Sequence, residues 1–68
     1  MGNSKAFIVE SRRPGEPVWY VAAKVAGRGY PLTGYRDAAE KFESAAMARV
    51  VLRRFSSTYN FVVTEVQS

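Results

Sequence analysis

The side chains of this sequence best suited to binding are arginines, and two of them lie on one flank of a predicted helix. Arg49 and Arg53 are four residues apart, so helical geometry places them side by side. Forked guanidinium groups in such a pair can hold a phosphate or a carboxylate through parallel hydrogen bonds. The alternative interpretation is the solvated flank of an amphipathic helix. The spacing alone does not decide between them.

A second group of candidate binding residues lies in a segment rich in glycine and tyrosine, residues 26–36. Flexible backbone, guanidinium groups and aromatic faces together are suited to stacking on unpaired bases. The alternative is a turn-rich loop whose tyrosine rings lie against the domain with their hydroxyls at the surface. The glycine spacing does not match a dinucleotide-binding fingerprint. The candidates in this segment are Arg28, Tyr30, Tyr35 and Arg36.

Arg12 and Arg13 open a third candidate region, the segment 12–17 (RRPGEP). Its prolines and glycine are typical of a turn, so both arginines are expected in an exposed hairpin loop. Exposed loops carry binding residues. Charge that keeps the loop solvated is an equally adequate explanation.

The residues that most enzymes use are missing. The sequence has no cysteine and no histidine, which removes thiol nucleophiles, the commonest metal ligand and the usual proton-transfer group near neutral pH. Six Asp and Glu residues remain, and we interpret them as solvated partners of nearby basic residues. We therefore expect no catalysis, no metal and no cofactor.

The elements that must position these residues can be read from hydrophobic patterns. Segment 5–11 (KAFIVES) is rich in β-branched and aromatic residues and predicts a strand. Segment 18–25 (VWYVAAKV) alternates, so it predicts a strand with Trp19, Val21, Ala23 and Val25 facing inward. Trp19 is expected in the core, and an interface anchor is the alternative. Segment 26–36 is expected to be irregular with a short strand near 30–32, and segment 60–66 (NFVVTEV) predicts the last strand.

One helix is predicted over residues 45–55, with Ser44 as its N-cap. An apolar stripe at i, i+3, i+4 and i+7 should lie on the sheet. Its members are Ala48, Val51, Leu52 and Phe55, and Met47 is expected to widen it.

These patterns predict an α+β fold, a small antiparallel sheet in ββ(β)αβ order packed on one amphipathic helix, as a single domain over residues 1–68. Such a two-layer domain leaves one face of its sheet for another cover. A core this small is marginal without disulfides or a metal. We therefore expect a homodimer, formed through that sheet face or through paired edge strands.

The overall charge is basic but not extreme. Ten Lys and Arg face six Asp and Glu, for a net charge of +4, which suits nucleic acid or acidic proteins but also simple solubility. No apolar run approaches the length of a membrane-spanning helix, and the first residues, 1–5, lack the apolar stretch of a signal peptide. We expect a cytoplasmic protein without membrane contact.

The stretch from Trp19 to Val51 resembles small orphan proteins of bacteriophages and prophages. The likeness rests on an aromatic hairpin strand, a Gly and Tyr loop, and the segment 39–48 (AEKFESAAMA) that leads into a helix. The resemblance implies an anti-CRISPR-like or other inhibitor, or an adaptor, that binds a host protein or protein complex without catalysis. Its basic charge departs from the acidic inhibitors that imitate DNA. The alternative is a nucleic-acid-binding protein that uses the arginines and tyrosines named above.

Overall fold

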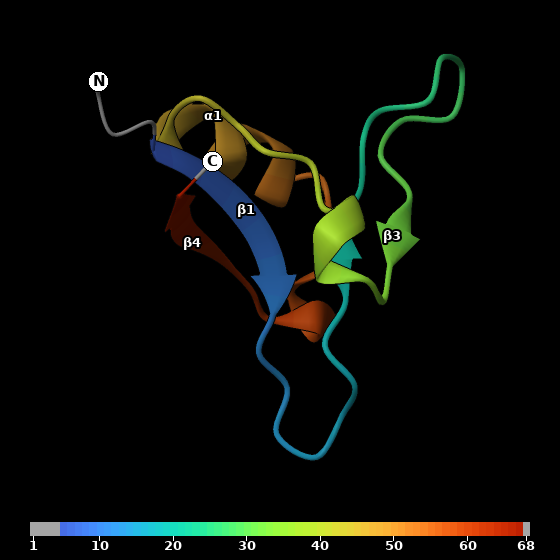
Figure 1. Cartoon of the computed structure of the whole chain (residues 1–68). Helices are drawn as coiled ribbons and strands as arrows, with labels where there is room; N and C mark the ends of the chain where they lie inside the picture. The colour runs from blue at the N-terminus through green and yellow to red at the C-terminus, as the bar shows by residue number, and fades with distance from the viewer. Residues whose placement is uncertain (1–4, 68) are drawn as a thin grey trace.

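The computed structural model describes residues 5–67 and confirms a small α+β fold with one antiparallel sheet and one α-helix (Figure 1). The sheet order is β3-β2-β1-β4. Residues 1–4, on which the signal-peptide expectation rests, lie outside the described part of the chain, as does residue 68. The elements are β1 (Lys5–Ser11), β2 (Tyr20–Val21), β3 (Leu32–Thr33), the short 3₁₀ helix η1 (Arg36–Ala38), α1 (Ala45–Leu52), the 3₁₀ helix η2 (Ser57–Tyr59) and β4 (Phe61–Gln67).

The first and last strands form the main ladder of the sheet. β1 and β4 pair antiparallel along their whole lengths, from Lys5 opposite Gln67 to Ser11 opposite Phe61. Asn60 leads into β4 with a left-handed φ of 52°, a conformation that Asn tolerates better than most residues. The Asn60 side-chain amide donates to the backbone oxygen of Arg12 at 3.0 Å. Both predicted strands are therefore confirmed, each to within one residue.

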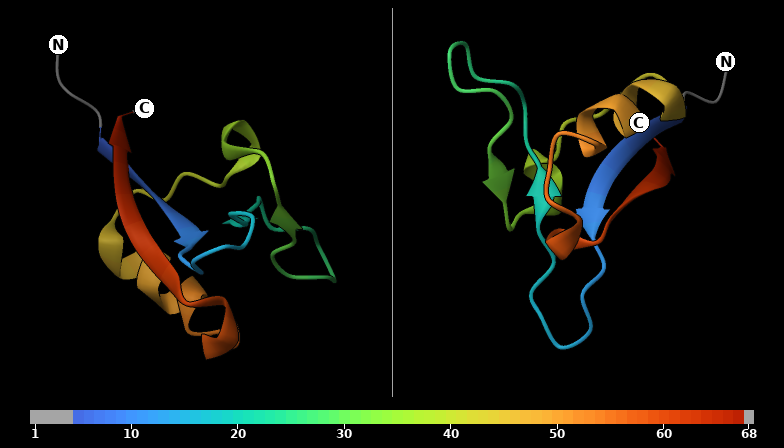
Figure 2. Two further views of the ribbon diagram at one scale, coloured as in Figure 1. Left: turned by 90° about the horizontal axis from the view of Figure 1, so that it is seen from below. Right: turned by 180° about the vertical axis from the view of Figure 1, so that it is seen from behind.

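The second predicted strand is much shorter than its alternation indicates. β2 comprises only Tyr20 and Val21, and of the four residues expected to face inward only Val21 is buried. The physical reason is a lack of strand partners, because β1 pairs with β2 at Glu10 and then diverges from it. The segment before α1 fills that fork, with isolated bridges from Ala39 to Ala22 and from Phe42 to Phe7. The right panel of Figure 2 shows β2 and β3 splayed away from β1.

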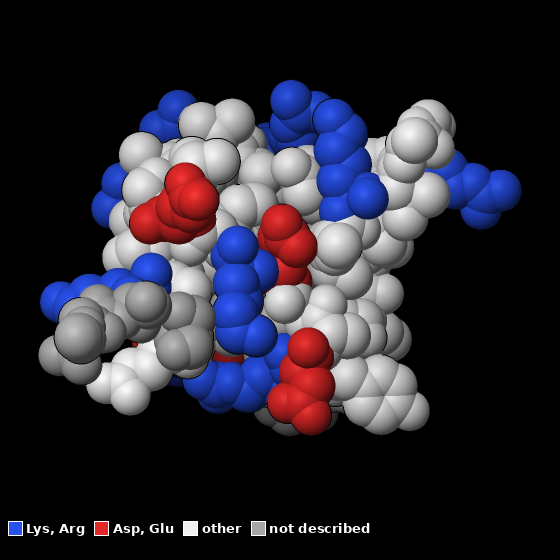
Figure 3. All heavy atoms as spheres, turned by 45° about the horizontal axis from the view of Figure 1, so that its top comes forward, with Lys and Arg blue, Asp and Glu red and all other residues white. Residues whose placement is uncertain are grey.

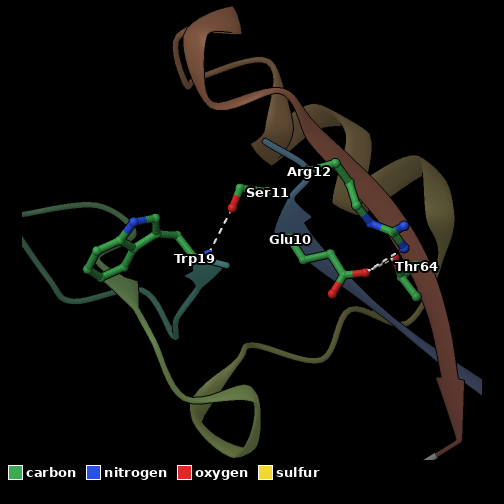
Figure 4. Close-up of polar contacts among 5 residues, drawn as sticks. All are labelled: Glu10, Ser11, Arg12, Trp19 and Thr64. Atoms are coloured by element: carbon green, nitrogen blue, oxygen red, sulfur yellow. Dashed lines mark hydrogen bonds and ion pairs between the residues drawn. The ribbon is translucent and has the colours of Figure 1, made fainter. Parts of the chain in front are cut away.

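Trp19 is not a core residue, contrary to the sequence interpretation. Its side chain is 41% exposed. Its backbone N–H donates to Ser11 Oγ at 2.8 Å, and its carbonyl accepts from the Ser11 N–H at 2.9 Å. These two bonds close the base of the β1–β2 loop and leave the indole at the surface (Figure 4).

The helix begins where its capping residue predicts. Ser44 has extended backbone, and its hydroxyl accepts from the Met47 N–H at 3.2 Å, which satisfies one of the unpaired donors of the first turn. The helix ends earlier than expected, at Leu52. Met47 does not widen the buried stripe, since its side chain is 52% exposed.

The core lies between α1 and one face of the β1–β4 ladder. Val9 and Ala48 are fully inaccessible to solvent, and Phe61 packs between the rings of Phe55 and Tyr59, with ring centroids 5.2 and 5.1 Å apart. The buried core residues are Val9, Val21, Phe42, Ala48, Val51 and Phe61. Leu52 and Phe55, from the predicted stripe, are half-buried against this cluster.

The opposite face of the sheet is covered within the chain at β1. Ala6, Ile8 and Glu10 are all buried there, and Figures 1 and 2 show η1 on the side of the sheet away from α1. A hollow of about 320 Å³ lies beside Ile8 and is lined by Arg36, Asp37 and Lys41. This face is therefore less available to a second copy than the sequence suggests.

Candidate functional site

A groove runs between α1 and the hairpin that joins β2 to β3, and we call it the helix groove. Its volume is about 230 Å³. The buried side chains of Phe42 and Val51 form its floor, whereas Met47 and Val50 are exposed by 52% and 56%. The lining residues are Lys24, Tyr30, Phe42, Met47, Val50, Val51 and Arg54.

The apolar part of the groove exists because α1 carries a broader apolar arc than its core needs. Val51 and Ala48 point into the core, and the arc continues outward to Met47 and Val50. Met47, Val50 and Val51 follow one another at i, i+3 and i+4 of α1, so they form a second apolar stripe beside the predicted one. Exposed apolar side chains gathered next to a hollow are typical of a contact surface.

The tyrosine of the hairpin forms the other wall. Tyr30 is half-buried, and its ring packs on Phe42 with centroids 6.1 Å apart at a tilt of 51°. The hairpin turns tightly at its tip, since the Val25 and Gly29 backbones exchange hydrogen bonds of 2.7 and 3.0 Å. Gly27 and Gly29 have φ near +80°, which glycine adopts without strain. Lys24 and Tyr30 themselves lie outside any strand, so the irregular character expected for this segment is confirmed, and the tight turn at its tip holds the wall in place.

Two cations flank the groove. Lys24 comes from the hairpin and Arg54 from the turn after α1. The ion pairs found among residues 5–67 are Lys5 with Glu65 and Arg12 with Glu10, so within that range neither flanking cation has a carboxylate within 4 Å. The groove therefore offers an apolar floor between two uncompensated positive charges.

The arginines and tyrosines singled out from the sequence lie on separate parts of the surface. Arg28 is at the hairpin tip, Arg36 is in η1, and Arg12 and Arg13 line a shallow hollow at the β1–β2 loop. Arg49 is exposed on α1, and Arg53 lines a different hollow beside Leu52 and Phe61. Figure 3 shows the basic side chains of one face in several groups, with carboxylates and neutral surface between them. The fold does not gather these residues into one patch.

Arg12 has an internal role that its sequence position does not reveal. Its Nη2 donates to Glu10 Oε1 at 2.9 Å, and the Thr64 hydroxyl donates to the same oxygen at 2.8 Å (Figure 4). Glu10 is only 7% exposed, so the interpretation of every carboxylate as solvated is wrong for this residue. Its bonds join the end of β1 to β4.

The two tyrosines of segment 26–36 have different environments. Tyr30 lies against the domain, whereas Tyr35 is 77% exposed. Tyr35 donates its backbone N–H to Thr33 Oγ1 at 3.1 Å, which fixes the turn before η1. Its free ring stands beside Arg36 in the chain.

The groove residues Lys24, Met47, Val50 and Arg54 were not identified from the sequence as candidate binding residues, and Met47 was expected to be buried instead. A signal for part of this set was present, because Val50 adds an apolar residue outside the predicted stripe. The contribution of Lys24 had no local signal, since it depends on how the hairpin folds over α1.

No helix described by the structure is long and apolar enough to cross a membrane. Among residues 5–67, no three His, Cys, Asp or Glu side chains lie close enough together to hold a metal ion. Comparisons of the chain with protein-family models, with curated proteins and with solved structures give no match.

Proposed function

We propose that this chain is a small non-catalytic protein-binding module that receives an apolar side chain of its partner in the helix groove. The observation that carries the proposal is the exposure of Met47 and Val50 beside a buried floor of Phe42 and Val51. Apolar anchors in pockets that exclude water contribute most of the affinity at protein interfaces. The Val25–Gly29 hydrogen bonds and the Tyr30–Phe42 ring contact hold the second wall beside α1, which reduces the ordering needed on binding.

The flanking charges define the chemistry of the partner segment. Lys24 and Arg54 favour a segment whose apolar anchor has carboxylates beside it. Complementary charges at the rim speed association and select against basic competitors. The expected ligand is thus an acidic segment with an aliphatic or aromatic anchor.

The resemblance to small phage proteins gives the proposal a more specific form. In that form the module is a phage-type inhibitor, anti-CRISPR-like, or an adaptor, and its partner is a host protein or protein complex in the host cytoplasm. Neither form requires chemistry beyond surface complementarity. The helix groove supplies the same contact in both.

Affinity capture with matched groove variants tests this proposal. The tagged full chain is incubated with bacterial lysate, with and without nuclease, beside Val50→Asp, Arg54→Glu and the control Arg49→Glu. Val50 and Arg54 line the groove, whereas Arg49 lies on α1 outside it. We expect the wild type and Arg49→Glu to capture the same partner protein, and Val50→Asp to capture at least about tenfold less of it. Nuclease should not change the amount captured. Equal capture by all four chains would place the interface elsewhere.

Nucleic-acid binding is the second candidate function, and one observation favours it. Tyr35 exposes 77% of its surface next to Arg36, a combination that can stack on an unpaired base. The dispersed positions of the other arginines support the protein-binding proposal more than this alternative. A phosphate backbone is bound best by cations that share one track.

A further inference from the structure

β4 (Phe61–Gln67) is an outer strand of the sheet, and one of its edges faces away from β1. In the left panel of Figure 2, β4 is the strand nearest the viewer, with β1 and α1 behind it. The hydrogen bonds of β1 show which residues of β4 point their backbone N–H and C=O groups toward β1 and which point them outward. The N–H of Arg12 donates to Asn60 at 3.1 Å, while those of Phe7 and Ser11 donate away from β4, to Phe42 and Trp19.

Because antiparallel ladders alternate, residues 62, 64 and 66 direct their backbone groups toward β1. Phe61, Val63, Glu65 and Gln67 direct theirs outward, and we call this row the β4 edge. Among residues 5–67, none of the hydrogen bonds outside the β1–β4 ladder reaches the β4 edge. The row of free donors and acceptors is shaped for an extended strand.

The usual protections of an exposed edge are scarce here. Edge strands are normally blunted by proline, lysine, bulges or a covering segment. β4 has the sequence FVVTEVQ, without proline or lysine, and pairs in register over all seven residues without a bulge. Its single charge, Glu65, is partly neutralised by Lys5 at 3.7 Å.

We infer that the β4 edge pairs antiparallel with the β4 edge of a second copy of this chain, about a two-fold axis at Thr64. In this register Val62 faces Val66 of the second copy, and the two Thr64 residues face each other. These are positions without direct backbone bonds, where side chains approach most closely. Val62, Thr64 and Val66 are half-buried in one copy, so the pairing completes a ladder of β-branched side chains.

The strand itself selects this register over its neighbours. A two-fold axis at Glu65 would put two carboxylates directly opposite each other, which is unfavourable. An axis at Val63 would leave Gln67 without an opposite residue in β4. The axis at Thr64 pairs each residue from Phe61 to Gln67 and sets Glu65 opposite Val63 of the second copy. This dimer uses the sheet edge, so it does not depend on the helix groove or on the proposed function.

Proline at Glu65 gives a selective test. The Glu65 N–H belongs to the β4 edge rather than to the β1 ladder, and its side chain is exposed, so Glu65→Pro removes the outward donor while sparing the core. Glu65→Ala is the matched control, because it loses the ion pair and keeps the N–H. By sedimentation equilibrium over micromolar concentrations, we expect a dimer for the wild type and for Glu65→Ala. Dimerisation of Glu65→Pro should be about tenfold to a hundredfold weaker, since symmetry removes the donor from both copies.

A cross-linking experiment tests the register even if the proline variant fails to fold. The natural chain has no cysteine, so Val62→Cys and Val66→Cys each carry one thiol. Residues facing each other at such positions have the separation that a disulfide requires. Mild oxidation should link a mixture of the two variants and leave each variant alone unlinked. A wild-type chain that stays monomeric, a Glu65→Pro dimer as tight as that of Glu65→Ala, or a mixture that does not cross-link would each overturn the inference.

Discussion

A single carboxylate illustrates what burial does to a residue that the sequence marks only as charged. Glu10 alternates with Ile8 and Ala6 on one face of β1, and all three are buried. Removing a carboxylate from water is costly unless it is paired and hydrogen-bonded. Glu10 receives both from Arg12 and Thr64. The pairing partner on β4 is far away in sequence, so no local pattern could indicate it.

Thr64→Val tests the contribution of this arrangement. The change keeps the shape of the side chain and removes the hydroxyl that donates to Glu10 at 2.8 Å. We expect the free energy of unfolding to fall by about 1 to 3 kcal/mol, because a buried carboxylate loses one of its donors. Thr64→Ser, which keeps the hydroxyl, should lose less. Urea unfolding of both variants measures the difference, and equal midpoints for Thr64→Val and wild type would show that the bond has no net effect.

At the scale of elements, the sequence predicts the helices and strands that depend on local residues. It does not predict those whose extent depends on neighbouring segments that are distant in sequence. The Ser44 cap places the start of α1, and the β-branched runs place β1 and β4. The alternation of segment 18–25 is real, but a strand needs a neighbour, and the segment around Ala39 and Phe42 takes that position beside β1 and β2. Trp19 and Val25 lie outside the two residues of β2, and both are exposed. The helix groove was missed for a similar reason, because one of its walls is a distant hairpin.

Two adjacent valines of α1 test the orientation of the helix. Val51 is 6% exposed and belongs to the core, whereas Val50 is 56% exposed at the groove. We expect Val51→Ala to destabilise the fold by about 1 to 3 kcal/mol through lost burial and a small cavity. Val50→Ala should change stability by less than about 0.5 kcal/mol. Thermal unfolding of both variants checks the assignment, and the reverse order would mean that the helix is rotated.

At the scale of the whole molecule, the distribution of charge matters more than its sum. The net charge of +4 is compatible with nucleic acid, yet the arginines are dispersed over loops, η1 and α1. The composition gives the net charge, whereas the fold determines where the charged side chains lie on the surface. The two candidate functions therefore differ in the number of cations that can contact one ligand at once, and this number sets the response to salt.

Salt dependence separates these functions through Arg49 on α1 and Arg53 at its C-terminal cap. A protein that neutralises 6 to 10 phosphates loses about 10³- to 10⁵-fold in affinity between 50 and 200 mM salt. Binding releases counterions from the nucleic acid, and this release becomes less favourable as the salt concentration rises. We expect the captured partner to bind with less than about a tenfold loss over that range, since an apolar anchor carries the contact and the charges at its rim act mainly on association. Arg49 and Arg53 lie outside the groove, so Arg49→Glu combined with Arg53→Glu should slow association only through weaker long-range attraction of an acidic partner and leave dissociation nearly unchanged. If nucleic acid is the partner instead, the same pair of changes would lower affinity and flatten the salt dependence.

Electrophoretic shift with single- and double-stranded DNA and RNA at low salt gives the direct comparison. A shift there that weakens steeply with salt and depends on Arg49 and Arg53 would contradict the protein-binding proposal.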